Sequence, residues 1–272
     1  MPTRSKATRT VALIVVSLLL SAGRGAADEI RVMTSGAFTA ALLDVTAEFE
    51  RATHHKIIVV TTTIGTGATS IGSRLERHEP GDVVIVATGN LDEFIKAGTV
   101  AAGSRVDLAT SAIGMAVRAG APVPDVSTVA AFTRALLDAR SIAYSASVSG
   151  VYLSTELFQR LGIADRVLPK SRRIEGERVG AVVARGDAEI GFQQVSELLP
   201  VPGITLTGPL PPGVQRLTVY AAGIATHSAT PAAAKTLVNF LASAAAAPAI
   251  KKSGMEPAAV AVTPQRDRRA VR

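Results

Sequence analysis

The sequence predicts an α/β protein, and three observations carry that prediction. Apolar runs of strand length alternate with amphipathic stretches of helical period through most of the chain. The run "GDVVIVAT" at 81–88 is so continuous in valine and isoleucine that both faces of the strand are expected to be covered, as in a parallel sheet. The 272 residues include no cysteine, so the fold has to be held by its core and not by disulfides.

Strand and helix patterns follow one another in the first half of the chain. The predicted strands are 29–34, 56–62, 81–88 and 111–120. The predicted helices are 40–53, about 67–78, 90–100 and 128–139. Pro122 and Pro124 block regular structure ahead of the last helix, for which Asp125 or Ser127 can supply the N-cap.

The second half of the chain repeats this alternation of strands and helices. It begins with a strand, a small polar loop and a helix start at 140–150. The further predicted strands are 188–194, 203–212 and 215–225, and the helices are 151–162, 176–187, 230–243 and 245–254. The long strand at 215–225 is placed to return the chain to its first half. We therefore expect lobe 1 to comprise 28–109 and 218–260, and lobe 2 to comprise 110–217.

Both ends of the chain look unlike the rest. Residues 1–27 have basic residues, then an apolar run too short to span a bilayer comfortably, then small residues, which predicts a secretory signal peptide. Residues 261–272 form a basic tail that we expect to be disordered. The predicted location of the mature protein is the periplasm.

The charge distribution argues against nucleic-acid binding. The chain has a formal net charge of +7, but the leader carries +4 and the tail "RDRRAVR" carries +3, which leaves 28–265 neutral. No basic stripe with interleaved aromatic residues remains to bind a phosphate backbone. We expect no nucleic-acid partner.

Three loops share a layout of strand, small or hydroxyl residues, then helix. They are "TSGAFT" at 34–39, "TIGTGATS" at 63–70 and "SASVSGVY" at 145–152. Small residues let backbone N–H groups approach a ligand, and a helix start adds free donors, so each loop could hold an anion. A nucleotide is not indicated, because the second loop lacks the lysine of a phosphate loop and the glycine spacing of a dinucleotide fingerprint.

Metal, cofactor and hydrolytic sites have little support. His54 and His55 lie in a turn, while His78 and His227 are far from them and from each other in the sequence. No pair has metal-ligand spacing beside a carboxylate, and no G-x-S-x-G nucleophile elbow occurs. We expect no metal and no cofactor.

The order of several segments resembles a known family. "IRVMTSGAFTAALLDVTAEFERATHHKIIV", "TGATSIGSRLERHEPGDVVIVATGNLDEFIKAG", "RGDAEIGFQQVSELLPVPGI" and "HSATPAAAKTLVNFLASAAAAPAIKKSGMEP" are similar to the molybdate-binding branch of the type II periplasmic substrate-binding proteins. The similarity covers nearly all of 29–257. It implies two α/β lobes, each a mixed sheet flanked by helices, that close by hinge motion on a ligand in the cleft between them.

The resemblance also implies a set of ligand contacts, taken from the loops after the first two strands, the start of a lobe 2 helix and late lobe 2 residues. Carried over position by position, the expected ligand-binding residues are Ser35, Gly36, Ala37, Thr66, Gly67, Ser147, Ser149, Gly150, Arg178, Val179, Gln193 and Gln194.

Two departures from the family pattern bear on the ligand. Molybdate binders place a serine where Ala37 stands and a tyrosine where Gln194 stands, so two hydroxyl donors are lost. Gln193 and Gln194 offer amide groups suited to an organic ligand, and Arg178 could pair bidentately with a carboxylate. A small organic anion is slightly preferred over a molybdate-type oxyanion.

The resemblance implies a monomeric binding protein that presents a small anion to the membrane subunits of an ABC importer. The alternative is an enzyme, because some proteins similar to this branch are periplasmic isomerases of unsaturated tricarboxylates such as aconitate. An isomerase that shifts a proton needs a general base within reach of its ligand, for which the sequence offers Glu177 or Tyr152 as candidates.

Overall fold

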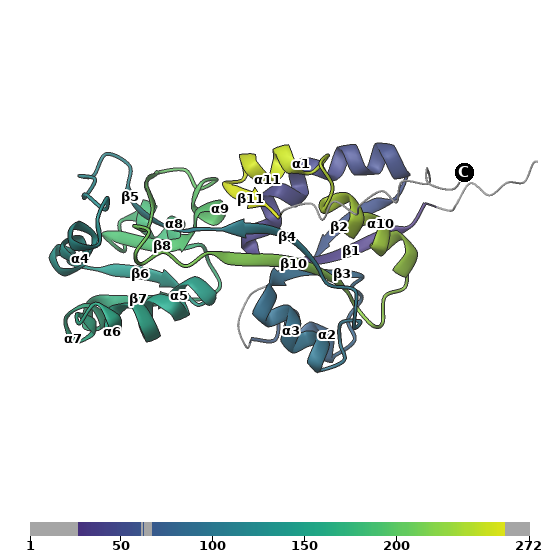
Figure 1. Cartoon of the computed structure of the whole chain (residues 1–272), viewed down its shortest axis with the longest axis horizontal. Coiled ribbons are helices and arrows are strands. Elements are labelled where there is room, and N and C mark those ends of the chain that lie inside the picture. The colour runs from purple at the N-terminus through teal and green to yellow at the C-terminus, as the bar shows by residue number, and fades with distance from the viewer. Residues whose placement is uncertain (1–26, 61, 63–66, 259–272) are drawn as a thin grey trace, which may run out of the picture.

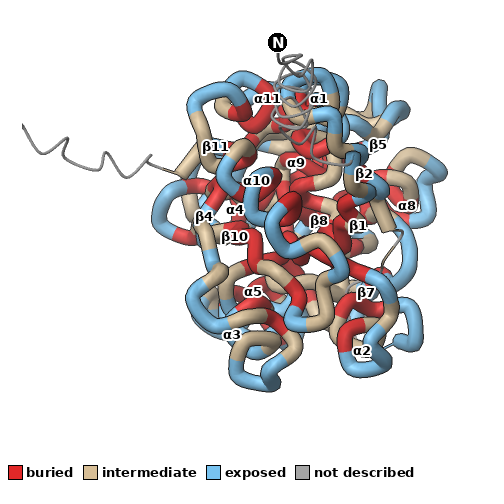
Figure 2. Tube along the Cα trace, turned by 90° about the vertical axis from the view of Figure 1, so that its right-hand side faces the viewer, coloured by how far each residue is buried: buried red, intermediate tan, exposed pale blue. Residues whose placement is uncertain are grey.

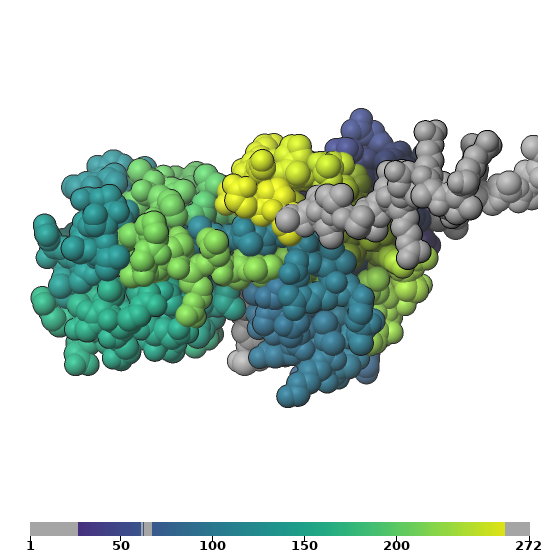
Figure 3. Space-filling view, viewed as in Figure 1, coloured from purple at the N-terminus to yellow at the C-terminus, as the bar shows by residue number. Residues whose placement is uncertain are grey.

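The computed structural model describes residues 27–60, 62 and 67–258. The predicted signal peptide up to residue 26, the basic tail and Thr66 lie outside the described residues. Two lobes stand side by side along the long axis of the molecule, each with its own sheet (Figures 1 and 3). Within the described residues, no helix is long and apolar enough to cross a membrane.

Lobe 1 is built on a six-stranded mixed sheet with the order β11-β4-β10-β3-β1-β2. Its strands are β1 Glu29–Thr34, β2 Lys56–Val60, β3 Val83–Ala87, β4 Val106–Ser111, β10 Thr218–Ile224 and β11 Met255–Pro257. β1 pairs in parallel with both β2 and β3, whereas β10 runs antiparallel to β3 and β4.

Helices cover both faces of this sheet. They are α1 Gly36–Thr53, α2 Ile71–Glu76, α3 Thr88–Lys96, α10 Pro231–Leu241 and α11 Ala247–Lys252. Val83 and Ile85 of β3 pack into one core with α1, α10 and α11, while Val84 and Val86 pack into another with α2 and α3. The buried strands lie between these layers (Figure 2). The prediction that both faces of this strand are covered is therefore confirmed.

Lobe 2 has a five-stranded mixed sheet with the order β7-β6-β8-β5-β9. Its strands are β5 Ile113–Arg118, β6 Ile142–Ser145, β7 Ser171–Ile174, β8 Ile190–Gln194 and β9 Ile204–Pro209. Its helices are α4 Val129–Asp138, α5 Val148–Tyr152, α6 Phe158–Arg160, α7 Ala164–Val167, α8 Val179–Arg185 and α9 Val195–Leu198. A π-helical turn, Leu153–Leu157, joins α5 to α6.

The lobe 2 sheet is also covered on both faces. Side chains of α4, α5, α6 and α7 share one core with β5 and β8, and α8 forms a smaller core on the other face. Gly191 in β8 allows α8 to approach closely, because a Cβ there would lie 2.5 Å from a methyl group of Val183. The chain crosses between lobes where β4 passes into β5 at Ala112 and where β10 returns (Figure 1).

Some local expectations were wrong. Helix α2 begins at Ile71 and not near 67, because the Ser70 hydroxyl caps it by accepting a hydrogen bond from Ser73 N. Helix α4 is capped by Thr128, not by Asp125 or Ser127. The sequence patterns also missed the short elements β4, β7, β11, α7 and α9.

Asp82 braces lobe 1 at the start of β3. Its carboxylate accepts hydrogen bonds from Arg31 N at 2.8 Å, Ser228 Oγ at 2.6 Å and Ala229 N at 3.0 Å. Burial raises the pKa of this carboxyl, but the hydrogen bonds from Ser228, Arg31 and Thr230 outweigh burial and hold the pKa below its usual value. A single side chain thus ties β1, β3 and the segment before α10 together.

Replacing Asp82 with alanine should lower the free energy of unfolding by about 3 kcal/mol at neutral pH, because several buried donors lose their acceptor. Since the folded-state pKa is depressed, the stabilisation is present above the unfolded pKa and is lost as pH falls through the folded value. Urea unfolding from pH 7 to pH 3 measures the difference. An equal destabilisation by Glu76→Ala, at an exposed position, would contradict this role.

Candidate functional site

A cleft of about 310 Å³ lies between the two lobes. Lobe 1 contributes the β1–α1 junction and the end of β2, and lobe 2 contributes the loops after β6 and β7 with the end of β8. The lobe 1 residues at this cleft are Thr34, Gly36, Thr39, Val59, Val60 and Thr62, and the lobe 2 residues are 145–147, 174–178, Gln193 and Glu197. Strand ends of α/β sheets are the usual place for a ligand.

Three threonine hydroxyls lie on the lobe 1 wall. Thr34 and Thr39 both donate to the carbonyl of Ser35, at 3.1 and 3.0 Å, and Thr62 donates to the carbonyl of Thr34 at 2.9 Å. Ser35 is buried at the start of α1, and its Oγ has no hydrogen-bond partner among the described residues. The threonine hydroxyls keep lone pairs free but already donate their protons, whereas the Ser35 hydroxyl, which does not line the cleft, is free to donate.

Three serines meet at the lobe 2 wall, where β6 passes into α5. Ser145 Oγ lies 2.7 Å from Ser147 Oγ and 3.0 Å from Ser149 Oγ. Because a hydroxyl rotates freely, the triad can turn a donor toward a bound anion while keeping one of its internal bonds. Gly150 makes the turn possible, since a Cβ there would lie 1.7 Å from Ser145 O.

Glu197 on α9 is a cleft residue that the sequence analysis missed. Its side chain lines the cleft although the residue is only 7% exposed. Burial raises the pKa of this carboxyl to about 7, while Arg178 and the amide of Gln193 act in the opposite direction without cancelling the shift. A carboxyl that is partly protonated near neutral pH can both accept and donate a proton.

Two neighbours fix the Glu197 carboxyl in place. Gln193 Oε1 accepts a hydrogen bond from Val179 N at 2.9 Å, which orients the amide so that Nε2 donates to Glu197 Oε1 at 3.0 Å. Gly36 of lobe 1 lies on the other side, where a Cβ would be only 2.4 Å from Glu197 Oε1. Glu197 therefore reaches across from lobe 2 to the first turn of α1.

Arg178 is the cation of this cleft. It stands at the N-cap of α8, is half-buried, and forms no ion pair with any described residue. The positive charge of Arg178 acts on Glu197 and lowers the pKa of its carboxyl. An unpaired guanidinium beside hydroxyls and a protonatable carboxyl is suited to binding carboxylate groups.

The structure brings some of the predicted ligand residues to the cleft and not others. Gly36, Ser147, Arg178 and Gln193 line it, whereas the remaining predicted residues that are described do not border it. Those are Ser35, Ala37, Gly67, Ser149, Gly150, Val179 and Gln194. Thr66 lies outside the described residues.

Several of these residues have structural partners instead. Ala37 is packed in the lobe 1 core, and the Val179 N–H is taken by Gln193. Gln194 Nε2 donates to Thr218 Oγ1 at 3.0 Å, while its Oε1 has no partner within the described part of the chain. Both ends of the Gln193 amide are engaged, with Val179 N and with Glu197, so its visible role is to hold Glu197.

Neither general-base candidate from the sequence is free for that task. Glu177 is exposed and forms an ion pair with Arg185 at 2.9 Å, which holds the pKa of its carboxyl below the usual range. Tyr152 OH donates to Val214 O at 2.8 Å and accepts from Arg160 at 2.9 Å. Glu197 was recognisable only as an acid four residues after Gln193, in the mostly apolar stretch "VSELL" at 195–199.

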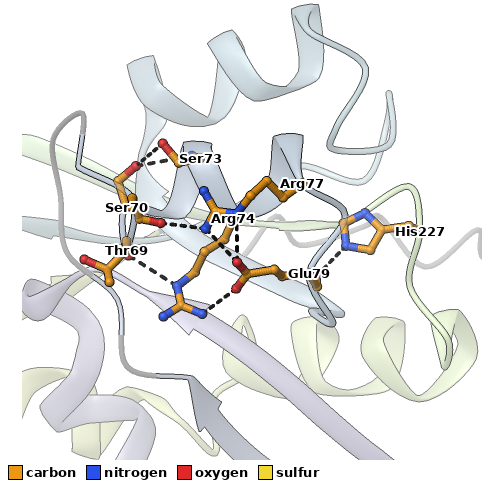
Figure 4. A network of polar contacts seen from close by, with 8 residues as sticks. Thr69, Ser70, Ser73, Arg74, Arg77, Glu79 and His227 are labelled. Carbon is orange, nitrogen blue, oxygen red and sulfur yellow. Dashed lines mark hydrogen bonds and ion pairs between the residues drawn. The ribbon is translucent and has the colours of Figure 1, made fainter.

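A polar network connects the segment 67–70 to Glu79 and His227 (Figure 4). Arg77 donates to Ala68 O at 2.6 Å, and both Arg77 and Arg74 form ion pairs with Glu79 at 2.6 Å. His227 Nε2 lies 2.8 Å from Glu79 O. Its ring stacks edge to face on that of His78, 5.4 Å between centroids, so the fold unites two histidines that are distant in sequence. The described residues contain no cluster that could hold a metal ion.

A second hollow, of about 520 Å³, adjoins the cleft through Ala146 and Ser147. It lies between α2 and α3 of lobe 1 and α5 of lobe 2. Its Arg216 is paired with Glu156 and stacks over the Tyr152 ring at 4.0 Å, so this cation is already engaged. The open interlobe space thus extends to both sides of the start of α5.

The chain belongs to the family of bacterial extracellular solute-binding proteins, whose model matches residues 30–256. Its fold is that of the type II periplasmic binding proteins, as the resemblance implied. The solved structure of the periplasmic molybdate-binding protein of Azotobacter vinelandii has a TM-score of 0.68 at 19% identity, and the match covers 83% of this chain and 98% of that one.

Two curated proteins are similar in sequence. A Pseudomonas sp protein named aconitate isomerase is 45% identical over 227 residues, which are 83% of this chain and 87% of that protein. The molybdate-binding protein ModA of Azotobacter vinelandii is 28% identical over 196 residues, which are 70% of this chain and 73% of that protein.

The raised pKa of Glu197 predicts how Glu197→Gln changes stability with pH. The folded protein binds this proton more tightly than the unfolded chain, so wild-type stability falls between the ordinary pKa of 4.5 and about 7. The variant lacks this loss. Between pH 4.5 and pH 8, the free energy of unfolding of Glu197→Gln should rise by about 3 kcal/mol relative to that of wild type. A pH-independent difference in urea unfolding would contradict the assigned titration.

Proposed function

We propose that this protein is an isomerase of a small unsaturated polycarboxylate of the aconitate type. The observation that carries the proposal is the buried, protonatable Glu197 carboxyl in the interlobe cleft. The 45% identity to a protein named aconitate isomerase supports the same substrate class. Acting on such a substrate needs no metal and no redox cofactor.

The reaction is a proton shift. Aconitate has a CH₂ carbon next to a C=C bond, and each carbon of its three-carbon chain carries one carboxyl group. Removal of a CH₂ proton gives an allylic carbanion, and return of the proton to the former vinylic carbon moves the double bond. The configuration about the new double bond can then be cis or trans, and no atom is gained or lost. Glu197 takes a proton from one carbon, can exchange it with solvent, and delivers a proton to the other carbon.

The remaining cleft groups bind the carboxylates. Arg178 can pair with one carboxylate through two parallel N–H groups. Ser145 and Ser147 line the lobe 2 side and can donate to a carboxylate, with Ser149 as a hydrogen-bond partner outside the cleft lining. The lobe 1 threonines can donate to the ligand only by turning away from the carbonyl groups that they now bind. This division leaves Gln193 to orient Glu197, so that binding and proton transfer rest on different side chains.

A second candidate function is the solute-binding subunit of an ABC importer. The family match and the two-lobed fold favour it, and a small organic anion would then be presented to the membrane subunits. The same cleft would hold the ligand, with an organic carboxylate preferred over a molybdate-type oxyanion because of Arg178. In both cases we place the protein in the periplasm, exported by its first 27 residues, and expect a monomer.

Incubation of the protein with trans-aconitate should produce cis-aconitate, which proton NMR can detect. In D₂O the protein should introduce deuterium at the CH₂ carbon. Glu197→Gln should lower turnover by about 10²–10⁴-fold, since it removes the group that carries the proton. Glu76→Gln, at an exposed position outside the cleft, is the matched control and should keep most of the activity.

Stabilisation of the protein by aconitate without any isomer or deuterium would rule out the enzyme and leave the importer subunit. A thermal-shift panel of molybdate, tungstate, sulfate and mono- to tricarboxylates tests that case, because a ligand of the native state raises stability by mass action. Stabilisation by molybdate alone would contradict both organic-anion proposals.

A further inference from the structure

The proposed site places a buried carboxyl where a multiply charged anion has to bind. Glu197 lines the cleft, and its Oε1 is confined between Gln193 Nε2 at 3.0 Å and the position of Gly36. It cannot turn away without losing the Gln193 bond. An ionised carboxylate held there would repel a bound carboxylate in surroundings that screen charge poorly.

Resting on the proposed substrate class, we propose that binding of a polycarboxylate draws one proton from solvent onto Glu197, which then meets the ligand as a neutral carboxylic acid. The cleft would thereby select its ligand by proton-coupled binding. Nothing about the ligand other than its negative charge and its hydrogen-bond acceptors is needed for this coupling.

The charged and titratable groups around Glu197 favour proton uptake by this carboxyl when a ligand binds. They are Arg178 at the start of α8, Tyr220 on β10, and Glu175 and Glu177 at the cleft edge. Arg178 is the cation that favours the ionised carboxylate, and it is also the natural partner of an arriving anion. Once paired with the ligand, it stabilises the Glu197 charge less.

The other charged and titratable groups near Glu197 do not oppose its uptake of a proton. Tyr220 is buried and its pKa lies well above the usual value, through burial and the nearby Glu197, so it stays neutral. Glu175 and Glu177 are exposed, and Glu177 is held ionised by Arg185. The α1 side presents Gly36 and Thr39, which do not titrate. Ligand binding therefore adds negative charge near Glu197 and offsets Arg178, the one cation of the described residues that acts on this carboxyl.

The coupling also constrains the proposed reaction. Glu197 has to lose the acquired proton before it can remove one from carbon. The pKa that governs kcat reports the substrate complex, whereas the pKa that governs kcat/KM reports the free protein. The first should exceed the second, and a carboxylate of raised pKa is the stronger base toward a CH₂ group.

Isothermal titration calorimetry with propane-1,2,3-tricarboxylate tests the proposal directly. This saturated analogue has no C=C bond, so it binds without reacting. At pH 8 its own carboxyls are ionised, and titrations in buffers of different ionisation enthalpy should give an uptake close to one proton per ligand. The uptake should decline toward pH 6, and the affinity of wild type should fall about tenfold per pH unit above neutrality.

Glu197→Gln should bind with no proton uptake and with an affinity that does not change over the same pH range. Glu76→Gln, at an exposed position outside the cleft, is the matched control and should behave as wild type. Zero uptake or proton release by wild type, equal uptake by Glu197→Gln, or no binding of either the analogue or trans-aconitate would overturn the inference. Proton uptake without isomerisation of aconitate would exclude the proposed enzymatic activity and leave the proton-coupled binding. Isomerisation without proton uptake would support the enzymatic activity and exclude the proton-coupled binding.

Discussion

The contact between Glu197 and Gly36 is the constraint on which the site depends. It joins α9 of lobe 2 to the first turn of α1 in lobe 1, and only a residue without a side chain leaves room for the carboxyl oxygen. The Gln193 amide, fixed by Val179 N, closes the other side. A carboxyl is thus buried where two lobes meet, and burial gives it a pKa near 7 that no exposed acid would have.

This carboxyl sets the cleft apart from one built of neutral donors alone. Hydroxyls and backbone N–H groups can hold an oxyanion without any acid, and the serine and threonine groups of this cleft are of that kind. Glu197 would only weaken such binding unless it is protonated or has a chemical task. The proposed unsaturated polycarboxylate would account for both conditions, because it would pair with Arg178 and would carry a CH₂ proton that the Glu197 carboxylate could remove.

The sequence predicted the architecture well, because strongly patterned elements such as β1, β3, α1 and α10 are decided by local periodicity. It missed the strand β7 and the helix α9, which have four residues each and are too short to show a periodic pattern. The three loops were identified by their small and hydroxyl residues, but which of these residues face the cleft depends on tertiary packing. Glu197 lies on one of the missed elements, and its burial arises from Gly36, more than 150 positions away in the chain.

The central claim is that Glu197 titrates near neutral pH and responds to the ligand. Carbon-13 NMR of protein labelled at glutamate Cδ measures this directly, with Glu197→Gln to assign the resonance. We predict one carboxyl that titrates near pH 7 in the free protein and at higher pH with propane-1,2,3-tricarboxylate bound. If every glutamate titrates below pH 5 in both states, the account of this cleft is wrong.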